Sequence, residues 1–403
     1  AGRWRAAGAG RMSGAGAGGA DPIYLDHNAT TPVDPKVLEA MLPYFTQVFG
    51  NPSSVEHIHG NRAQAAVAKA RVQVAAALGA RDNEIIFTGS CTEANNIAIL
   101  GAARARPERH HLITTAVEHP SVLEPFRQLA REGFELTILG VDEYGRVSAE
   151  AVAAALRDDT GLVSVMGANN EVGTIQPIAE IGAVCAARDV LFHTDLAQVM
   201  AHRRVDVAAE HIHLASISGH KAYGPKGIGA LYARSRSPRA RLAQTVYGGG
   251  QEKGLRSGTL NVPLIVGMGA ALELAAKLSG TETARVRALC AAFVDRIAAA
   301  IPGVQFNGHP TERIPGNVSL SIPSIEPLAL MHKLNGAASF SASSACATDK
   351  VETSHVLLAM FGDTPRARKA FRVSPGRSTT ANNMSLFAES LIAEVAALRR
   401  FAA

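Results

Sequence analysis

Short apolar runs alternate with helical patterns over most of this 403-residue chain, and this alternation most constrains its fold. Runs of five to seven residues are predicted to be buried strands, at 84–88, 111–116, 135–139, 161–167, 190–194, 212–217 and 228–233. Helical patterns are found between strands or before them, at 61–78, 92–106, 149–157 and 177–188. Continuous apolar strands alternating with helices predict an α/β fold, with a mainly parallel seven-stranded sheet covered by helices.

The pattern changes after about residue 275. A long amphipathic helix is predicted at 281–301, followed by a short strand at 317–322. Further helices are predicted at 325–334, 354–361 and 382–400. Mixed short elements of this kind favour a smaller α+β domain at the C-terminal end.

These patterns divide the chain into three parts. We expect a large domain at 34–275 and a small domain made of 21–33 and 276–403. The first strand of the small domain is expected to pair with residues 23–25. Residues 1–20 are rich in Gly, Ala and Arg without apolar periodicity, which predicts a disordered leader. A transit peptide is the alternative, because this start is basic, free of acids and lacks a secretory apolar stretch.

Composition argues against nucleic acid and membrane partners. The net charge is +5, and Arg3, Arg5 and Arg11 supply three of these charges. Aromatic residues make up only 5% of the chain, so a stacking platform for bases is not expected. The sequence contains no stretch of 18 or more apolar residues, so no membrane span is expected.

Four cysteines are present, Cys91, Cys185, Cys290 and Cys346, without the close pairing of zinc or disulfide motifs. This usage predicts a reducing, cytoplasmic setting. Cys185 and Cys290 lie in Ala-rich helical stretches and are expected to be buried packing residues.

Lys221 lies in a polar turn, SGHKAYGPKG, directly after the predicted strand 212–217. The turn carries a hydroxyl, an imidazole and an amine within four residues, and its glycines let the backbone approach a ligand closely. An amine in such a turn can form a Schiff base with a carbonyl compound or with pyridoxal phosphate (PLP). An exposed lysine in an ordinary loop is the alternative interpretation.

Polar side chains follow four other predicted strands. Thr92 opens a helix after a Gly-Ser turn, which suits a phosphate or a simple helix cap. His119 could stack on a flat ring or only pack locally, and Asn170 could donate to an oxygen or only shape a turn. Asp195 could hold a pyridine nitrogen protonated, with Gln198 on the same side, or only cap a helix. Five such strand ends together favour one site over five unrelated features.

The chain resembles the cysteine desulfurases of the NifS/IscS type, which are class-V aminotransferases with the fold-type I architecture of PLP enzymes. The resemblance runs from about residue 23 to residue 399. It is carried by YLDHNATTPVDP (24–35), GNPSSVEHIHG (50–60), FTGSCTEANNIAI (87–99), VEHPSV (117–122), ANNEVGTIQPI (168–178), FHTDLAQ (192–198), SGHKAYGPKGIGALY (218–232), GGGQEKGLRSGT (248–259) and SSAC (343–346).

The resemblance implies that residues 34–275 form a PLP-binding domain. Lys221 would be the Schiff-base lysine, and His119 would stack on the cofactor ring and assist proton transfer. Asp195 would pair with the pyridine nitrogen and Gln198 with the phenolic oxygen.

The resemblance also implies how phosphate and substrate are held. Thr92, Ser218 and His220 would bind the phosphate, helped by the backbone amide of Cys91. Thr259 would reach the phosphate of a neighbouring subunit, which implies a homodimer. Asn170, which also touches the cofactor, and Arg372 would hold the substrate carboxylate.

Cys346 would be the nucleophile that takes sulfur from L-cysteine, which leaves a persulfide and releases L-alanine. The sulfur would pass to an iron–sulfur scaffold protein or another acceptor, for cluster assembly or thio-modification. Two alternatives stay open, a selenocysteine lyase and a non-catalytic platform for sulfur transfer or partner binding. From the residues alone, Cys346 also fits a small buried hydrophobe.

Three stretches depart from the family pattern. The loop reads SASSACA, with Ser343 in place of a glycine and Ala347 in place of a hydroxyl residue. Cys91 stands where a small inert residue is usual. The segment 363–370 is more basic than expected, which fits a solvated face or a partner contact.

Overall fold

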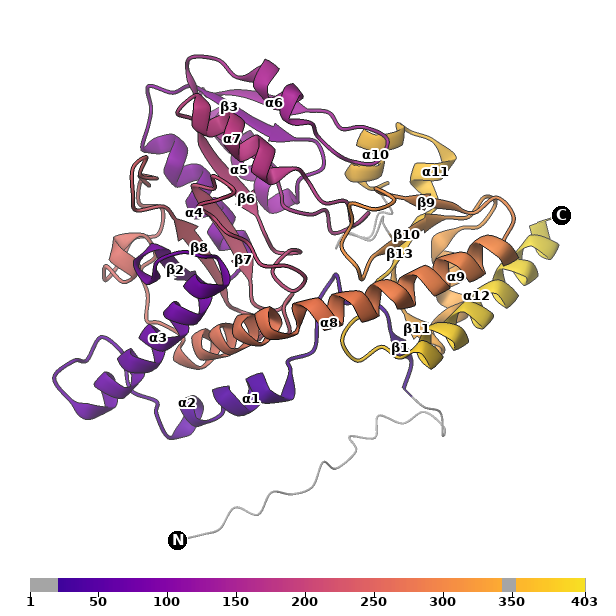
Figure 1. Ribbon diagram of the computed structural model, residues 1–403, viewed down its shortest axis with the longest axis horizontal. Helices are drawn as coiled ribbons and strands as arrows, with labels where there is room; N and C mark the ends of the chain where they lie inside the picture. The colour runs from indigo at the N-terminus through magenta and orange to yellow at the C-terminus, as the bar shows by residue number, and fades with distance from the viewer. Residues whose placement is uncertain (1–20, 343–352, 403) are drawn as a thin grey trace, which may run out of the picture.

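The computed structural model describes residues 21–342 and 353–402. The predicted leader 1–20 and the predicted nucleophile Cys346 lie outside these residues. Two units with separate apolar cores are joined by one long helix, α8 (Val262–Ala300) (Figure 1). The predicted boundary at 275/276 falls inside this helix.

The larger unit is built on a seven-stranded sheet with the strand order β2-β8-β7-β6-β5-β3-β4. Its strands are β2 (Ile85–Thr88), β3 (His111–Thr115), β4 (Glu135–Leu139), β5 (Thr160–Ser164), β6 (Leu191–Asp195), β7 (Leu214–Ser218) and β8 (Gly229–Ala233). All seven predicted strands are present. Only β8 runs against its neighbours, so the carboxyl ends of the other six strands meet at one edge.

Helices cover both faces of this sheet, as the apolar strands predicted. One face packs against α3 (Ile58–Ala77), α7 (Ile178–Ala187) and the first half of α8. The other face packs against α4 (Cys91–Arg104) and α5 (Pro120–Arg131). The remaining helices of the larger unit are α1 (Pro35–Met41), α2 (Pro43–Thr46) and α6 (Ala149–Ala155), with single 3₁₀ turns at Asp82–Glu84 and Glu252–Gly254.

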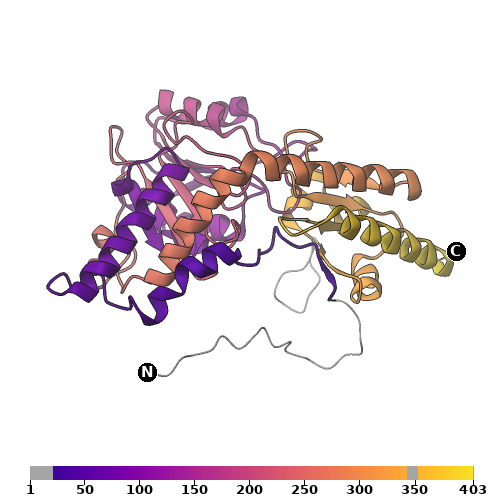
Figure 2. The same ribbon diagram turned by 60° about the horizontal axis from the view of Figure 1, so that its bottom comes forward.

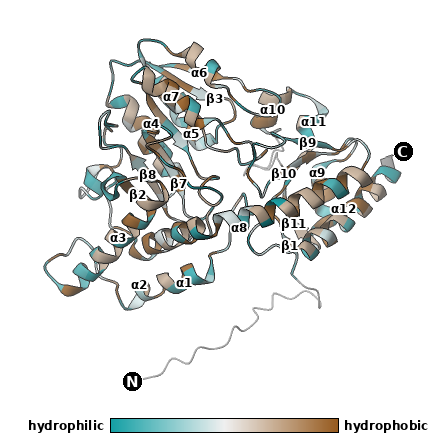
Figure 3. Ribbon diagram, viewed as in Figure 1, coloured by the Kyte–Doolittle hydropathy of each residue, from teal (hydrophilic) through white to brown (hydrophobic). Residues whose placement is uncertain are grey.

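Alternate residues of β2 face opposite helical layers. Ile85 and Phe87 of β2 lie in the core under α3 and α8, whereas Ile86 between them lies in the core under α4 and α5. Figure 3 shows that apolar residues run through the central strands. Burial on both faces is therefore the reason that these strands read as continuous apolar runs.

The smaller unit has a four-stranded antiparallel sheet with the order β12-β13-β10-β9. Its strands are β9 (Gln305–Asn307), β10 (Val318–Ser321), β12 (Ser341–Ala342) and β13 (Ala370–Val373). Its helices are α9 (Pro327–Leu334), α10 (His355–Phe361), α11 (Pro365–Arg368) and α12 (Ala381–Ala402). The second half of α8 and α12 run side by side over this sheet (Figure 2).

The predicted pairing of the strand 317–322 with the N-terminal segment is wrong. Strand β1 (Ile23–Tyr24) pairs in parallel with β11 (Ala338–Ser339), and Asp26 bridges to Ser374 just after β13. Both edges of β10 are already occupied by β13 and β9, which leaves no edge free for β1.

The predicted start of the long helix at residue 281 is also wrong, because α8 begins at Val262. Gly267 and Gly269 weaken the helical pattern in the sequence, since glycine has a low helix propensity. In the structure they allow close packing. A Cβ on Gly267 would lie 2.5 Å from the sulfur of Met41, and one on Gly269 would lie 2.9 Å from Cα of Ala70 in α3.

By length and composition α8 could cross a membrane. Its apolar residues instead pack in two protein cores, where Met268 and Phe293 are buried in different clusters. A long helix buried in the cores of a protein has the same length and apolar composition as a membrane span. The length and composition of α8 are therefore no separate evidence for a membrane span.

The close packing of α8 on α3 predicts a steric effect of one methyl group. Gly269→Ala should lower the free energy of unfolding by about 1–3 kcal/mol, because backbone atoms of α3 would have to move. Thermal unfolding measures this as a lower midpoint temperature. Gly280→Ala is the matched control in the same helix, because a Cβ there meets no described atom within 4 Å. It should leave stability unchanged or raise it by up to about 1 kcal/mol. Equal effects of the two changes would contradict the packing argument.

Candidate active site

A cavity of about 310 Å³ lies at the sheet edge where the parallel strands end. Nine residues singled out in the sequence line it, from five different strand ends: Cys91, Thr92, His119, Asn170, Asp195, Gln198, Ser218, His220 and Lys221. The structure therefore brings these five strand ends together around one cavity. Ligands in open α/β sheets bind at this edge.

Lys221 is held by backbone oxygens rather than by a carboxylate. Its Nζ donates to the carbonyl oxygens of Asn28 at 2.5 Å and Ala29 at 2.8 Å. Burial lowers the pKa of Lys221 to about 8, and the guanidinium of Arg372 acts in the same direction. An amine with this pKa is neutral far more often at physiological pH than an exposed lysine, and the neutral amine is the nucleophilic form.

Asp195 ends β6 and is almost fully buried. Its Oδ2 accepts from Nδ2 of Asn95 at 2.8 Å, and its Oδ1 accepts from the amide of Ala197 at 2.9 Å. The Cys91 thiol lies 3.5 Å from Oδ1. These donors fix the orientation of a carboxylate that lines the cavity.

Asn95 is a functional candidate that sequence reasoning missed. It lies one helical turn after Cys91 on α4, so both side chains face Asp195. The four-residue spacing of Cys91 and Asn95 was visible in the sequence. It indicates a contact with Asp195 only when β6 is known to lie beside α4.

The unusual Cys91 faces the cavity as a thiol. Burial, together with the nearby carboxylate of Asp195, raises the pKa of Cys91 well above its ordinary value. Cys91 is therefore a poor nucleophile in this position, since the thiolate is the reactive form.

His119 caps the N-terminus of α5 through its ring. Nδ1 accepts from the amide of Ser121 at 3.1 Å and lies 2.7 Å from the Ser121 hydroxyl. Desolvation lowers the pKa of His119, so the neutral ring is favoured. With Nδ1 acting as an acceptor, the ring proton belongs on Nε2.

Hydrogen-bond donors gather around the first turn of α4. Ser90 is the N-cap, and its Oγ accepts from the amide of Glu93 at 3.1 Å. Thr92 is exposed in the same turn, while Ser218 and His220 reach the cavity from the end of β7. Free amides, hydroxyls and the positive end of a helix dipole suit an anion such as phosphate.

His220 is neutral in this environment. Burial and the charges of Lys221 and Lys226 lower the pKa of His220 to about 4. Its Nδ1 lies 3.0 Å from Oγ1 of Thr30. The ring therefore offers a hydrogen bond rather than a charge.

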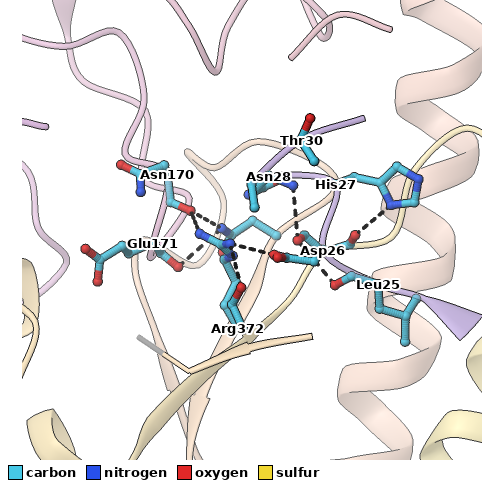
Figure 4. A network of polar contacts seen from close by, with 12 residues as sticks. Leu25, Asp26, His27, Asn28, Thr30, Asn170, Glu171 and Arg372 are labelled. Atoms are coloured by element: carbon cyan, nitrogen blue, oxygen red, sulfur yellow. Dashed lines mark hydrogen bonds and ion pairs between the residues drawn. The ribbon is translucent and has the colours of Figure 1, made fainter. Parts of the chain in front are cut away.

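Arg372, on β13, is not part of the cavity lining, and Figure 4 shows its guanidinium between Asn170 and Asp26. Its guanidinium donates to the backbone oxygen of Asn170 at 2.7 Å and to Oδ1 of Asp26 at 2.7 Å. Sequence reasoning identified Arg372 and Asn170 but missed Asp26, which neutralises the arginine. The structure thus brings the two predicted substrate residues together at the boundary between the two units.

Gln198 donates from Nε2 to the backbone oxygen of Asn28 at 2.8 Å, the same oxygen that Lys221 contacts.

Thr259 lies outside the cavity. It is exposed just beyond the 3₁₀ turn Glu252–Gly254 and is not part of the cavity lining.

Cys346 lies in 343–352, outside the described residues, so its placement stays a prediction. The described residues on either side of that segment contact the site region. Ser341 accepts from Arg372 at 3.3 Å, and Ser354 donates to Glu171 at 2.5 Å.

Comparison with known proteins agrees with this architecture. The aminotransferase class-V family model matches residues 23–387. A cysteine desulfurase from Mus musculus is 46% identical over 379 residues, which cover 94% of this chain and 82% of the relative. A solved NifS-like protein superposes with a TM-score of 0.86 at 34% identity, covering 93% of this chain and 99% of that one. A second solved structure, SspA in complex with cysteine, has a TM-score of 0.78 at 36% identity and covers 89% and 100%.

The match extends over both units and includes every strand end that lines the cavity. The resemblance expected from the sequence motifs is confirmed, and the chain belongs to the cysteine desulfurases within the class-V aminotransferase family.

Proposed function

We propose that the protein is a PLP-dependent cysteine desulfurase that converts L-cysteine to L-alanine and delivers the sulfur to an acceptor. The observation that carries the proposal is the amine of Lys221, with its pKa lowered to about 8, in one cavity with the carboxylate of Asp195. The relatives named cysteine desulfurase and the solved complex with cysteine support the choice of substrate.

The residues of the cavity fit PLP. Lys221 offers an amine for the aldehyde, and Asp195 offers a carboxylate for the pyridine nitrogen. The first turn of α4 offers hydrogen-bond donors for the phosphate. PLP would supply an electron sink that stabilises negative charge on the substrate. Asn95 would keep Asp195 oriented, and the proton on Nε2 of His119 would be available on the cavity side.

The proposal assigns the substrate carboxylate to Arg372. Its Nε has no hydrogen-bond partner among the described residues, and Asp26 and Asn170 hold its two terminal nitrogens. A substrate carboxylate would gain from an arginine whose orientation is already fixed.

Sulfur transfer is assigned to Cys346. Its thiolate would attack the substrate sulfur, so that a sulfur–sulfur bond forms while the carbon–sulfur bond breaks. The carbon then takes a proton and leaves as alanine, and the enzyme keeps a persulfide. An iron–sulfur scaffold protein, or another acceptor for thio-modification, would receive this sulfur.

A homodimer is part of the proposal. Several large apolar side chains of the N-terminal helical segment are exposed, namely Leu38, Leu42, Phe45, Phe49, Val55 and Ile58. Exposed apolar groups in one segment are typical of an interaction surface. Thr259 is exposed as well, as a residue that serves a neighbouring subunit would be.

Lys221→Arg tests the amine directly. The variant should lack the visible absorbance of bound PLP and lose alanine formation at least about a thousand-fold, because arginine stays protonated. Lys226→Arg, in an exposed position of the same turn, is the control and should keep both properties. Covalently held PLP in Lys221→Arg would refute the assignment.

Cys346→Ala separates cofactor binding from sulfur transfer. We expect normal PLP absorbance but no persulfide by mass spectrometry and no alanine from L-cysteine. Cys290→Ala, in the small-unit core, should retain activity. Alanine formation from selenocysteine that persists in Cys346→Ala, with a strong preference over cysteine, would favour a selenocysteine lyase instead.

The lowered pKa of Lys221 predicts how the attachment of PLP depends on pH. Only the neutral amine attacks an aldehyde, so the attachment rate of cofactor-free protein should rise about tenfold per pH unit below pH 8. It should level off above pH 8, because burial holds the pKa of Lys221 at about 8. Stopped-flow absorbance measures this rate. A profile that keeps rising to pH 10, as for an exposed lysine, would contradict the prediction.

A further inference from the structure

An ion pair joins the first turn of α4 to the glycine-rich loop that precedes α8. Nε of Arg256 lies 2.9 Å from Oε1 of Glu93, and one terminal nitrogen lies 3.5 Å from Oε2. The same carboxylate accepts a short hydrogen bond from the amide of Gly89, in the turn between β2 and α4. Glu93 therefore shapes this turn while Arg256 holds its carboxylate in place.

The loop that carries Arg256 is itself anchored to β2. Glu252 accepts from the amide of Phe87 at 2.7 Å and forms a two-point ion pair with Arg71 of α3, at 2.6 and 2.8 Å. Glu252 and Lys253 adopt left-handed backbone angles, with φ of 49° and 59°. Such conformations cost free energy in residues other than glycine and persist only where surrounding contacts hold them.

The charge of Glu93 creates a conflict at a phosphate site. Glu93 directly follows Thr92, and its carboxylate lies against the turn whose amides would face the phosphate. A carboxylate there stabilises the helix start but repels a phosphate dianion. Arg256 compensates that charge, since its Nε binds Oε1 of Glu93 and one terminal nitrogen lies 3.5 Å from Oε2, the oxygen that accepts from the amide of Gly89.

We propose that Arg256 is a positioning residue that compensates the charge of Glu93 and thereby makes the first turn of α4 receptive to the cofactor phosphate. Arg256 acts through Glu93 and does not touch the cofactor. The inference rests on the proposed function, because it concerns the phosphate of PLP.

Two ligands that differ only by the phosphate test the proposal. We compare the dissociation constants of PLP and of pyridoxal for the full-length protein, by absorbance at equilibrium. Arg256→Gln should weaken PLP binding at least about tenfold, because an uncompensated carboxylate would lie against the turn that receives the phosphate. Pyridoxal binding should change less than about twofold, and the loss for PLP should shrink at high salt.

The partner residue supplies a second variant. Glu93→Gln removes the charge but keeps an acceptor for the amide of Gly89. The double variant Glu93→Gln/Arg256→Gln should therefore recover PLP affinity to within about threefold of the wild type. Glu132→Gln is the matched control, because it breaks the exposed ion pair with Arg104 at the other end of α4 and should change neither ligand.

The outcomes separate this proposal from the proposed function. Equal losses for PLP and pyridoxal in Arg256→Gln would show a general structural role and overturn the inference. No loss, or no recovery in the double variant, would overturn it as well. A wild-type protein that binds neither ligand would overturn the proposed function first, and this inference with it.

Discussion

The site depends on the common direction of five strands in one hydrogen-bonded sheet. Because β2, β3, β5, β6 and β7 all run the same way, the turns that follow them meet at one edge. Residues about 130 positions apart, from Cys91 to Lys221, thus line one cavity. The antiparallel strand β8 lies between β2 and β7 in this sheet. It begins close beside Ser90 because Gly229 has no side chain; a Cβ there would lie 2.5 Å from the carbonyl carbon of Ser90.

Much of the fold could be predicted because a strand that is buried on both faces of a sheet appears in the sequence as a continuous apolar run. The seven strands of the large sheet were predicted to within a few residues for this reason. The helix Pro120–Arg131 was missed, and it contains Pro125, which weakens a helical pattern. The pairing of β1 with β11 involves two residues on each strand, too few to leave a pattern. The start of α8 was predicted too late because Gly267 and Gly269, which allow close helix packing, weaken the helical pattern in the sequence.

The site was predictable where residues face the ligand cavity and not where they support other residues. Lys221, Asp195 and His119 stand at strand ends, which is visible in the sequence. Asn95 and Asp26 act by orienting a carboxylate and an arginine, and these partners are brought near only by the fold. The basic segment near Arg366 and Arg368 is explained by local partners, because Arg366 binds Asn307 and Phe306, and Arg368 pairs with Asp363. Arg366 is half-buried against these partners, so only Arg368 of the two fits the interpretation as a solvated face.

Helix α8 has a mechanical consequence for the whole molecule. Its 39 residues span about 58 Å as one uninterrupted rod, with one half embedded in each core. The distance between the two cores can change only if backbone hydrogen bonds inside this rod break or bend. Lys221 follows β7 in the larger unit and Arg372 lies on β13 in the smaller unit, so the two residues are carried by the two parts that this helix joins. The helix is therefore a stiff link that limits how far the sheet of one unit can separate from the sheet of the other.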